Sequence, residues 1–298
     1  GLHERGGERR PLQPETYVLP QDHAALLAAL AEDAAPGDSR VEERSWILKP
    51  ARMADGHGVR RVHGEELRAL VAGGGPVAAR RLGRGTVAQR YVDEPLLWQG
   101  KKFDLRLYVL VASHRPLRVF LYRDGYVRLA PLNFTRERSH NASHDRRVHI
   151  TNRSQHNRQV RRCARPLASL QHALFDGSEG AAAWSRLWGR IEDMLSRVFA
   201  VVLLQGKRAA GLCGKVYGVD VLIDAAHWPR LLEINRAPAI DPGTGCPGVR
   251  AVHEPLARDV LDRLLPAYAA EAAEAEEASG RLSRLVAALL GHPRLRGA

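Results

Sequence analysis

Two apolar segments separated by only four residues, VYGVDVLID and PRLLEIN, constrain the fold most because they carry carboxylates within hydrophobic sequence. Asp220 lies between two valines in the first segment, and Glu233 and Asn235 flank Ile234 in the second. Val, Leu and Ile occur on both faces of these segments, which predicts a β-hairpin that is buried on both sides. Burying carboxylates there is costly unless a cation compensates them. The hairpin therefore predicts a site at which a positive charge faces these acids.

The expected register of this hairpin brings its polar side chains together. If the residues AAHW form the loop, Asp224 pairs with Pro229, and Asp220 lies directly opposite Glu233. Directly opposed residues point to the same face of a sheet, and Asn235, two residues beyond Glu233, shares that face. Two carboxylates and an amide oxygen suit Mg²⁺, which proteins usually hold with few ligands together with nucleotide phosphates. The alternative is a surface hairpin with ordinary outward-facing polar residues.

A second predicted strand, KFDLRLYVLV, carries charges on one face. Lys102, Asp104 and Arg106 alternate with apolar residues, and the strand continues as YVLV, which indicates a central position in a sheet. Cations on a buried face need anionic partners, and ATP phosphates together with the metal cluster would provide them. Arg123, at the end of the neighbouring strand in FLYRDG, is expected to join them. The alternative is an internal ladder of Lys, Asp and Arg ion pairs.

Upstream, a lysine precedes a glycine-containing loop. Lys49 ends the predicted strand SWILK, and the loop that follows contains Asp55, Gly56 and Gly58. A lysine at this position can hold a phosphate while backbone N–H groups close over it. The segment lacks the spacing of a P-loop, and the chain has no dinucleotide-binding fingerprint.

Charge and cysteine content limit the partners and the compartment. The net charge of +12 predicts attraction to polyanions, although a solvated arginine-rich surface would give the same value. The three cysteines have no metal-ligand spacing and predict free thiols in a reducing compartment. The longest apolar run, 198–204, is too short to cross a bilayer, and no signal peptide is recognised. We therefore expect no membrane partner.

Taken in order, the motifs WILKP, DGHGV, QRYV, KFDLRLYVLV, FLYRDGYVR, HITN, GVDVLID and LLEINRAP resemble the tubulin–tyrosine ligase-like family. The resemblance implies an α+β ATP-grasp fold, mostly antiparallel sheets with flanking helices, and a nucleotide in the cleft between two subdomains. It implies an ATP- and Mg²⁺-dependent ligase that adds an amino acid (Glu, Tyr or Gly) to a carboxylate of an acidic tail, tubulin above all, through an acyl phosphate. The alternatives are a catalytically inactive module that binds ATP and microtubules, and a basic nucleic-acid-binding protein. The last is disfavoured because the chain has no basic platform interleaved with aromatic residues and no reading helix.

The resemblance also implies subdomains and a location. The expected organisation is a flexible lead-in (1–16), a central subdomain (17–92), a C-terminal subdomain (93–267) with a basic loop (131–149), and an Ala/Glu-rich helical tail (268–298). The expected location is the cytoplasm and cytoskeleton, including a cilium or flagellum.

Roles for individual residues follow from the same resemblance. The implied roles are as follows: ATP phosphate contacts by Lys49, Asp55, Gly56 and Gly58; a hinge strand reading adenine at Gln89, Arg90, Tyr91 and Val92; nucleotide contacts by Lys102 and Asp104; the transferred phosphate and acceptor carboxylate held by Arg106 and Arg123; the incoming amino acid or phosphates at Thr151 and Asn152; and Mg²⁺ ligands at Asp220, Glu233 and Asn235.

The sequence departs from the family pattern at several points. Arg90 stands where the family usually has Lys, and RSQHNRQ follows HITN in place of the usual hydrophobic residue and amide. The family's N-terminal subdomain is expected to be absent from this sequence. These departures leave the identity of the added amino acid open.

Overall fold

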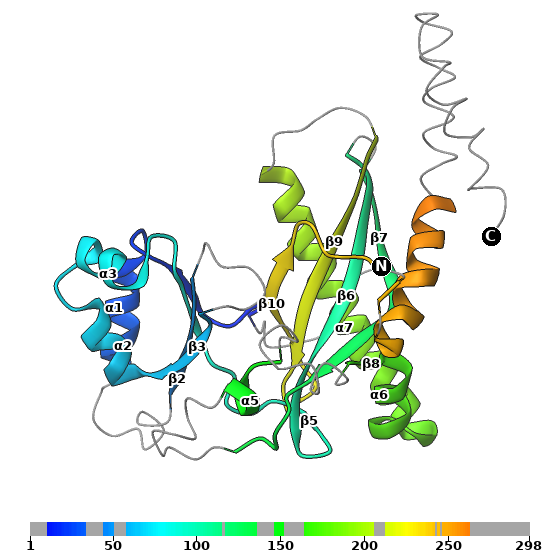
Figure 1. Ribbon diagram of the computed structural model, residues 1–298, viewed down its shortest axis with the longest axis horizontal. Coiled ribbons are helices and arrows are strands. Elements are labelled where there is room, and N and C mark those ends of the chain that lie inside the picture. The colour runs from blue at the N-terminus through cyan, green and yellow to red at the C-terminus, as the bar shows by residue number, and fades with distance from the viewer. Residues whose placement is uncertain are drawn as a thin grey trace, which may run out of the picture.

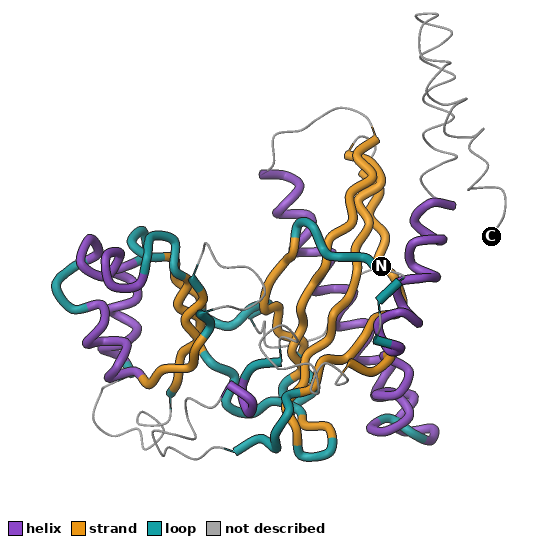
Figure 2. Tube along the Cα trace, viewed as in Figure 1, coloured by secondary structure: helices purple, strands orange, loops and turns teal. Residues whose placement is uncertain are grey.

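Two β-sheets face each other in the computed structural model, each backed by helices on its outer side (Figures 1 and 2). The structure describes residues 11–33, 44–50, 58–114, 117–135, 146–151, 164–205, 212–241, 243, 244 and 246–262. All strand pairs among the described residues are antiparallel and helices flank the sheets, so the predicted α+β class is confirmed.

The first sheet has four strands in the order β1-β4-β2-β3. Its strands are β1 (Thr16–Val18), β2 (Ser45–Lys49), β3 (Arg60–His63) and β4 (Val87–Arg90). Helices α1 (His23–Glu32), α2 (Gly64–Val71) and α3 (Gly75–Leu82) cover one face, where they bury Trp46, Leu48 and Ala88. Because side chains alternate along a strand, Lys49 and Gln89 project from the opposite face.

The second sheet runs in the order β10-β9-β6-β7-β8, with β5 paired to β6. Its strands are β5 (Leu97–Trp98), β6 (Lys101–His114), β7 (Leu117–Leu129), β8 (Ala164–Pro166), β9 (Leu212–Ile223) and β10 (Pro229–Asn235). The helices α6 (Leu167–Leu174) and α7 (Gly177–Gln205) cover one face.

The pleat of β6 decides what each face of this sheet offers. Phe103, Leu105 and Leu107 join Leu187 and Ile191 of α7 in the largest apolar core. The residues between them therefore turn to the other face, toward the first sheet. On that face, a helix formed by residues 247–262 also packs against the sheet near Tyr108 and Tyr126.

The register of the β9–β10 hairpin differs from the predicted one near its loop. Pro229 pairs with Ile223, not with Asp224, so the hairpin loop is longer than AAHW. A β-bulge between Leu231 and Glu233 then shifts the register and restores the predicted pairing of Glu233 with Asp220. The predicted functional face of the hairpin is therefore formed although the loop was assigned too short.

The segments around the sheets differ from the expectation in part. Residues 11–15 of the predicted flexible lead-in run between the sheets, since the carbonyl of Leu12 accepts from Leu231 N–H at 2.9 Å and that of Glu15 accepts from Arg90 N–H at 2.7 Å. The predicted basic loop ends in a one-turn helix, α5 (Arg146–His149), while residues 136–145 and the tail 268–298 lie outside the described residues. No helix in the described part of the chain is long and apolar enough to cross a membrane.

Candidate active site

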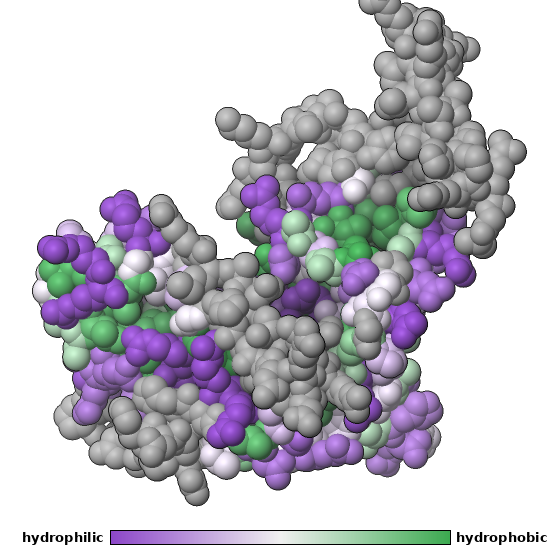
Figure 3. All heavy atoms as spheres, in the orientation of Figure 1, coloured by the Kyte–Doolittle hydropathy of each residue, from purple (hydrophilic) through white to green (hydrophobic). Residues whose placement is uncertain are grey.

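A cleft of about 1010 Å³ separates the two sheets. The space-filling view shows a hollow between the two lobes with hydrophilic residues in its depth (Figure 3). A volume of this size is at the upper end of the range typical of ligand pockets. Of the residues predicted for the site, the following line the cleft: Lys49, Gln89, Arg90, Tyr91, Val92, Lys102, Asp104, Arg106, Thr151, Asp220, Glu233 and Asn235.

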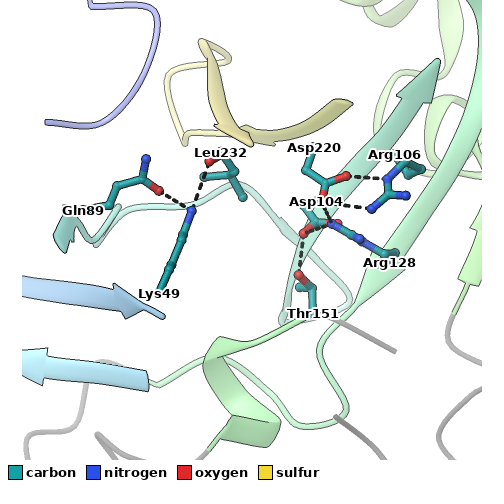
Figure 4. Close-up of polar contacts among 8 residues, drawn as sticks. All are labelled: Lys49, Gln89, Asp104, Arg106, Arg128, Thr151, Asp220 and Leu232. Atoms are coloured by element: carbon teal, nitrogen blue, oxygen red, sulfur yellow. Dashed lines mark hydrogen bonds and ion pairs between the residues drawn. The ribbon is translucent and has the colours of Figure 1, made fainter. Parts of the chain in front are cut away.

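The floor of the cleft is a continuous chain of ion pairs across three strands (Figure 4). Arg106 on β6 donates to both carboxylate oxygens of Asp220 on β9, with Nε–Oδ1 at 2.5 Å and Nη2–Oδ2 at 3.1 Å. Arg128 on β7 lies between two acids, with its Nη2 2.7 Å from Asp220 Oδ2 and its Nε 2.6 Å from Asp104 Oδ1. Asp104 also accepts a hydrogen bond through its other oxygen, Oδ2, from Thr151 Oγ1 at 2.5 Å.

These groups are almost fully enclosed, which makes each of them depend on the others. Asp220 is 1% exposed and Arg128 is 6% exposed. Burial alone would raise the pKa of Asp220, but the Arg128 and Arg106 guanidiniums outweigh it and hold that pKa well below its usual range. Breaking a buried pair by removing one partner typically costs about 3–5 kcal/mol, because an uncompensated charge remains.

Glu233 lies beside Asp220 on the same face of the hairpin. Its side chain is open to the cleft, yet the surrounding protein limits its hydration, and this loss together with repulsion from Asp220 raises its pKa to about 7. Asn235 lines the same wall. Two close carboxyl groups that repel each other, with an amide oxygen beside them, form a donor set that fits Mg²⁺. Among the described residues no group of three His, Cys, Asp or Glu side chains gathers for a metal, so any such ion would need the amide or other oxygens.

Two lysines border the cleft from different sheets: Lys49 ends β2 of the first sheet, and Lys102 lies on β6 of the second sheet, two residues before Asp104. Lys49 Nζ donates to Gln89 Oε1 at 2.8 Å and reaches across the cleft to the carbonyl of Leu232, at the β10 bulge, at 3.0 Å. Lys102 is 7% exposed and its ammonium lies 4.0 Å from the centre of the Tyr91 ring. Burial lowers the pKa of Lys49, and burial together with the nearby Arg61 and Lys49 charges lowers the pKa of Lys102 to about 7. Lys49 and Lys102 are therefore available to bind an anion that enters the cleft.

The predicted hinge offers its backbone to the cleft. The N–H groups of Arg90 and Tyr91 donate to the carbonyls of Glu15 and Ser45, whereas in the described part of the chain the N–H of Val92 has no hydrogen-bond partner. The Arg90 side chain turns to the helix-covered face, where its guanidinium lies 4.2 Å from the Trp46 ring and pairs with Asp33. The Arg90 guanidinium is therefore engaged with Trp46 and Asp33, away from the face that carries Lys49 and Gln89.

Arg123 is the one described charged residue of the predicted set that the structure places outside the cleft. Its side chain is 78% exposed and pairs with Glu192 of α7 at 3.0 Å, on the opposite face of the sheet. Arg128, which the sequence analysis did not select, occupies the cleft position instead. The signal was present, since Val127 and Leu129 are core residues and alternation turns Arg128 to the other face.

The remaining predicted residues lie at the edge of the description. Gly58 has a left-handed backbone (φ 72°) and is not part of the cleft lining. Asp55, Gly56 and Asn152 lie outside the described residues.

Two facing antiparallel sheets, with Lys49 on one wall and Lys102 beside the paired acids on the other, define an ATP-grasp protein. A model of the tubulin-tyrosine ligase family matches residues 2–272, and the chain belongs to this family.

Individual relatives agree with this assignment. The chain is similar to a tubulin polyglutamylase of Mus musculus (27% identity; 76% of this chain, 25% of the relative). It is also similar to a tubulin polyglutamylase of Caenorhabditis elegans (30% identity; 84% and 40%) and to a tubulin monoglutamylase of Homo sapiens (29% identity; 76% and 18%). The chain thus spans less than half the length of these curated relatives.

Proposed function

We propose that this chain forms the catalytic part of an ATP- and Mg²⁺-dependent ligase that joins an amino acid to a carboxylate in the acidic tail of tubulin. The observation that carries the proposal is the buried floor network of Arg106, Asp220, Arg128 and Asp104, with Lys102 on the same sheet and Lys49 on the opposite one. Such a network is expensive for stability alone, because apolar residues of similar volume would usually fill the space at less cost. A substrate of tubulin would place the enzyme in the cytoplasm, on the cytoskeleton.

The reaction has two steps that this cleft can hold. A carboxylate oxygen attacks the γ-phosphorus of ATP and ADP leaves, giving an acyl phosphate. The amine of the incoming amino acid then attacks the acyl carbon, phosphate leaves, and the nitrogen loses a proton. The first step is needed because a carboxylate oxygen is a poor leaving group.

The chain's own residues would bind and position these groups. Val92 N–H would meet the base at the hinge, and Lys49 and Lys102 would bind the phosphates by exchanging their present contacts for phosphate oxygens. Arg106 and Arg128 each carry five N–H donors, of which the acids use only some. The free donors would face the transferring phosphoryl group, where preorganised positive charge lowers the barrier.

Asp220, Glu233 and Asn235 would hold Mg²⁺. When bound, the ion would supply positive charge that offsets the charge of the phosphate groups. The metal fits because burial and the nearby Asp220 disfavour the ionised form of Glu233, which a cation would relieve.

The test is incorporation of labelled amino acid. Purified chain, Mg-ATP and tubulin are incubated with radiolabelled Glu, Tyr or Gly separately, and protein-bound label and ADP are measured together. Stoichiometric label and ADP are expected with one of the three amino acids. Measurable ATP binding without incorporation of any of them would favour the inactive ATP- and microtubule-binding module instead.

Ligation should weaken as salt rises. An acidic tail is drawn to a chain of net charge +12, and exposed charges are screened within roughly 10 Å at 0.1 M salt. Arg236 and Arg250, both exposed, flank the cleft residues Asn235 and Val249 and are positioned to meet such a tail. We expect KM for a Glu-rich peptide to rise between 25 and 200 mM NaCl, with KM for ATP changing less. Equal KM for the peptide at both concentrations would mean that the basic composition plays no part in recognition.

Nucleotide affinity should fall as pH rises through about 7. Lys102 has its pKa lowered to about 7, so it is charged below this pH and neutral above it. Phosphates favour the charged form, so affinity is highest below the pKa and can fall by up to about tenfold per pH unit above it. The measurement is ADP binding by calorimetry between pH 6 and 9. Lys102→Arg keeps its charge over this range, so its affinity should lack this loss while sharing any titration of ADP itself. Parallel profiles for the two proteins would contradict the prediction.

A further inference from the structure

Two adjacent arginines on β3, Arg60 and Arg61, project from opposite faces of the first sheet. Arg60 points outward and pairs with Glu66 on α2 at 2.6 Å, with a side chain 39% exposed. Arg61 points inward and is 7% exposed, and it lies on the side of the sheet that faces the second lobe. A buried guanidinium is costly unless well paired. Among the described residues its one ion pair, with the partly exposed Asp93, is long at 3.7 Å, and its Nε has no partner.

Arg61 instead closes a triangle with Tyr91 and His149. Its Nη1 lies 3.3 Å from His149 Nε2, and its Cζ lies 4.7 Å from the centre of the Tyr91 ring. The third side is Tyr91 Oη, 2.9 Å from His149 Nδ1. Arginine can only donate, so Nε2 accepts, and Nδ1 carries the proton that it donates to Tyr91 Oη. The triangle therefore fixes the orientation of both rings.

The three corners come from segments that are distant in the sequence. Arg61 is on β3, Tyr91 follows β4 at the hinge, and His149 ends α5. Thr151, two residues after His149, bonds Asp104 in the floor network. The triangle thus joins the first sheet, the hinge and the floor of the cleft.

The Tyr91 ring in turn holds Lys102. The ammonium lies 4.0 Å from the ring centre and has no hydrogen-bond partner among the described residues, so the cation–π contact with Tyr91 helps to fix its position. Tyr91 also precedes Val92, which lines the cleft and whose N–H has no hydrogen-bond partner in the described part of the chain. A shift of this ring would displace both groups that face a nucleotide.

We propose that Arg61 is a positioning residue of the nucleotide site, which holds the Tyr91 ring so that Lys102 and the Val92 amide face the nucleotide. The inference rests on the proposed ATP site. Arg61 does not line the cleft, so it acts through Tyr91 and His149 and makes no contact of its own with the nucleotide. The free-energy cost of burying the Arg61 guanidinium would then be offset by better nucleotide binding and not by a more stable fold.

The test compares Arg61→Met, Arg61→Lys and the matched control Arg60→Met. Methionine keeps the packing volume but loses the charge and the donors, while lysine keeps a charge and a donor. We expect Arg61→Met to weaken Mg-ADP binding by about tenfold and to raise KM for ATP similarly, with kcat changed less than about threefold. Arg61→Lys should recover much of the loss, and Arg60→Met should bind as the unaltered chain does.

The outcomes separate this inference from the proposed function. If the unaltered chain binds no Mg-ADP, both are wrong, because there is no nucleotide site to position. If it binds and Arg61→Met has the same Kd and KM as Arg60→Met, the inference alone is wrong. Equal losses in Arg61→Met and Arg61→Lys, with a lowered Tm in both, would also overturn it in favour of a folding role. Should Arg61→Met fail to fold, Tyr91→Phe keeps the ring but loses the bond to His149; a threefold weaker Kd supports the triangle, and an unchanged Kd overturns it.

Discussion

Replacing Arg128 with lysine is expected to lower ligation about 100- to 1000-fold while the protein still folds and binds nucleotide. Lysine keeps one positive charge between Asp104 and Asp220, but its single ammonium cannot reproduce the forked contacts at 2.6 and 2.8 Å to Asp104 together with the one at 2.7 Å to Asp220. The variant would therefore lack the aligned guanidinium donors that Arg128 offers to the transferring phosphoryl group. Because that contact strengthens in the transition state, kcat should fall more than nucleotide affinity.

The matched control is Arg123→Lys on the same strand. Arg123 is largely exposed and pairs with Glu192 on the far face, and exposed pairs contribute only about 0–1 kcal/mol. Its replacement should leave kcat, KM and Tm unchanged within error. Single-turnover incorporation with ADP binding measured in parallel checks both variants. Full activity in Arg128→Lys, or a comparable loss in Arg123→Lys, would contradict the assignment of the floor arginine.

The choice between these two arginines shows what a motif conveys and what it omits. FLYRDGYVR contains both, and motif position alone favoured the first. The apolar residues Val127 and Leu129 pack against the α7 side, so alternation assigns Arg128 to the cleft and Arg123 to the helix side. The decisive information was therefore local and present in the sequence.

The hairpin shows a different limit. The pairing of Asp220 with Glu233 followed from apolar patterning, yet the loop was one residue longer than predicted at its start, and the β10 bulge compensated for it. A bulge depends on what approaches the strand. Here the carbonyl of Leu232 is reached by Lys49 from the other lobe at 3.0 Å, a contact that no local pattern contains.

Long-range side-chain clusters were the least predictable part of the site. Arg61, Tyr91 and His149 are separated by tens of residues and carry no shared spacing, so only the folded chain brings them together. Within VRRV, alternation predicts that the two arginines face opposite sides. It cannot say which of them meets a second lobe, because that depends on how the two sheets pack.

Replacing Glu233 with glutamine is expected to reduce ligation by at least about 100-fold without destabilising the fold. The amide is nearly isosteric, but it cannot supply a charged oxygen to a cation, and the proposed Mg²⁺ site would lose one of its two carboxylates. The sign of the stability change follows from the pKa of about 7, which lies above the usual value for a glutamic acid. A raised carboxyl pKa means that the ionised form is disfavoured in the folded state, so its charge opposes folding once the pH exceeds the unfolded-state value.

Glutamine removes that charge and the repulsion from Asp220, so Tm at pH 8 should be equal to or above that of the unaltered chain. At pH 4 the acid is mostly protonated in both states, so the two Tm values should nearly agree. Glu254→Gln, an exposed acid on the helix of residues 247–262, serves as the control and should change neither Tm nor activity. Incorporation assays across Mg²⁺ concentrations and melting curves at the two pH values are the measurements. Undiminished turnover in Glu233→Gln would remove this residue from the metal site. A lower Tm at pH 8 would instead show that the carboxylate stabilises the fold, contrary to its raised pKa.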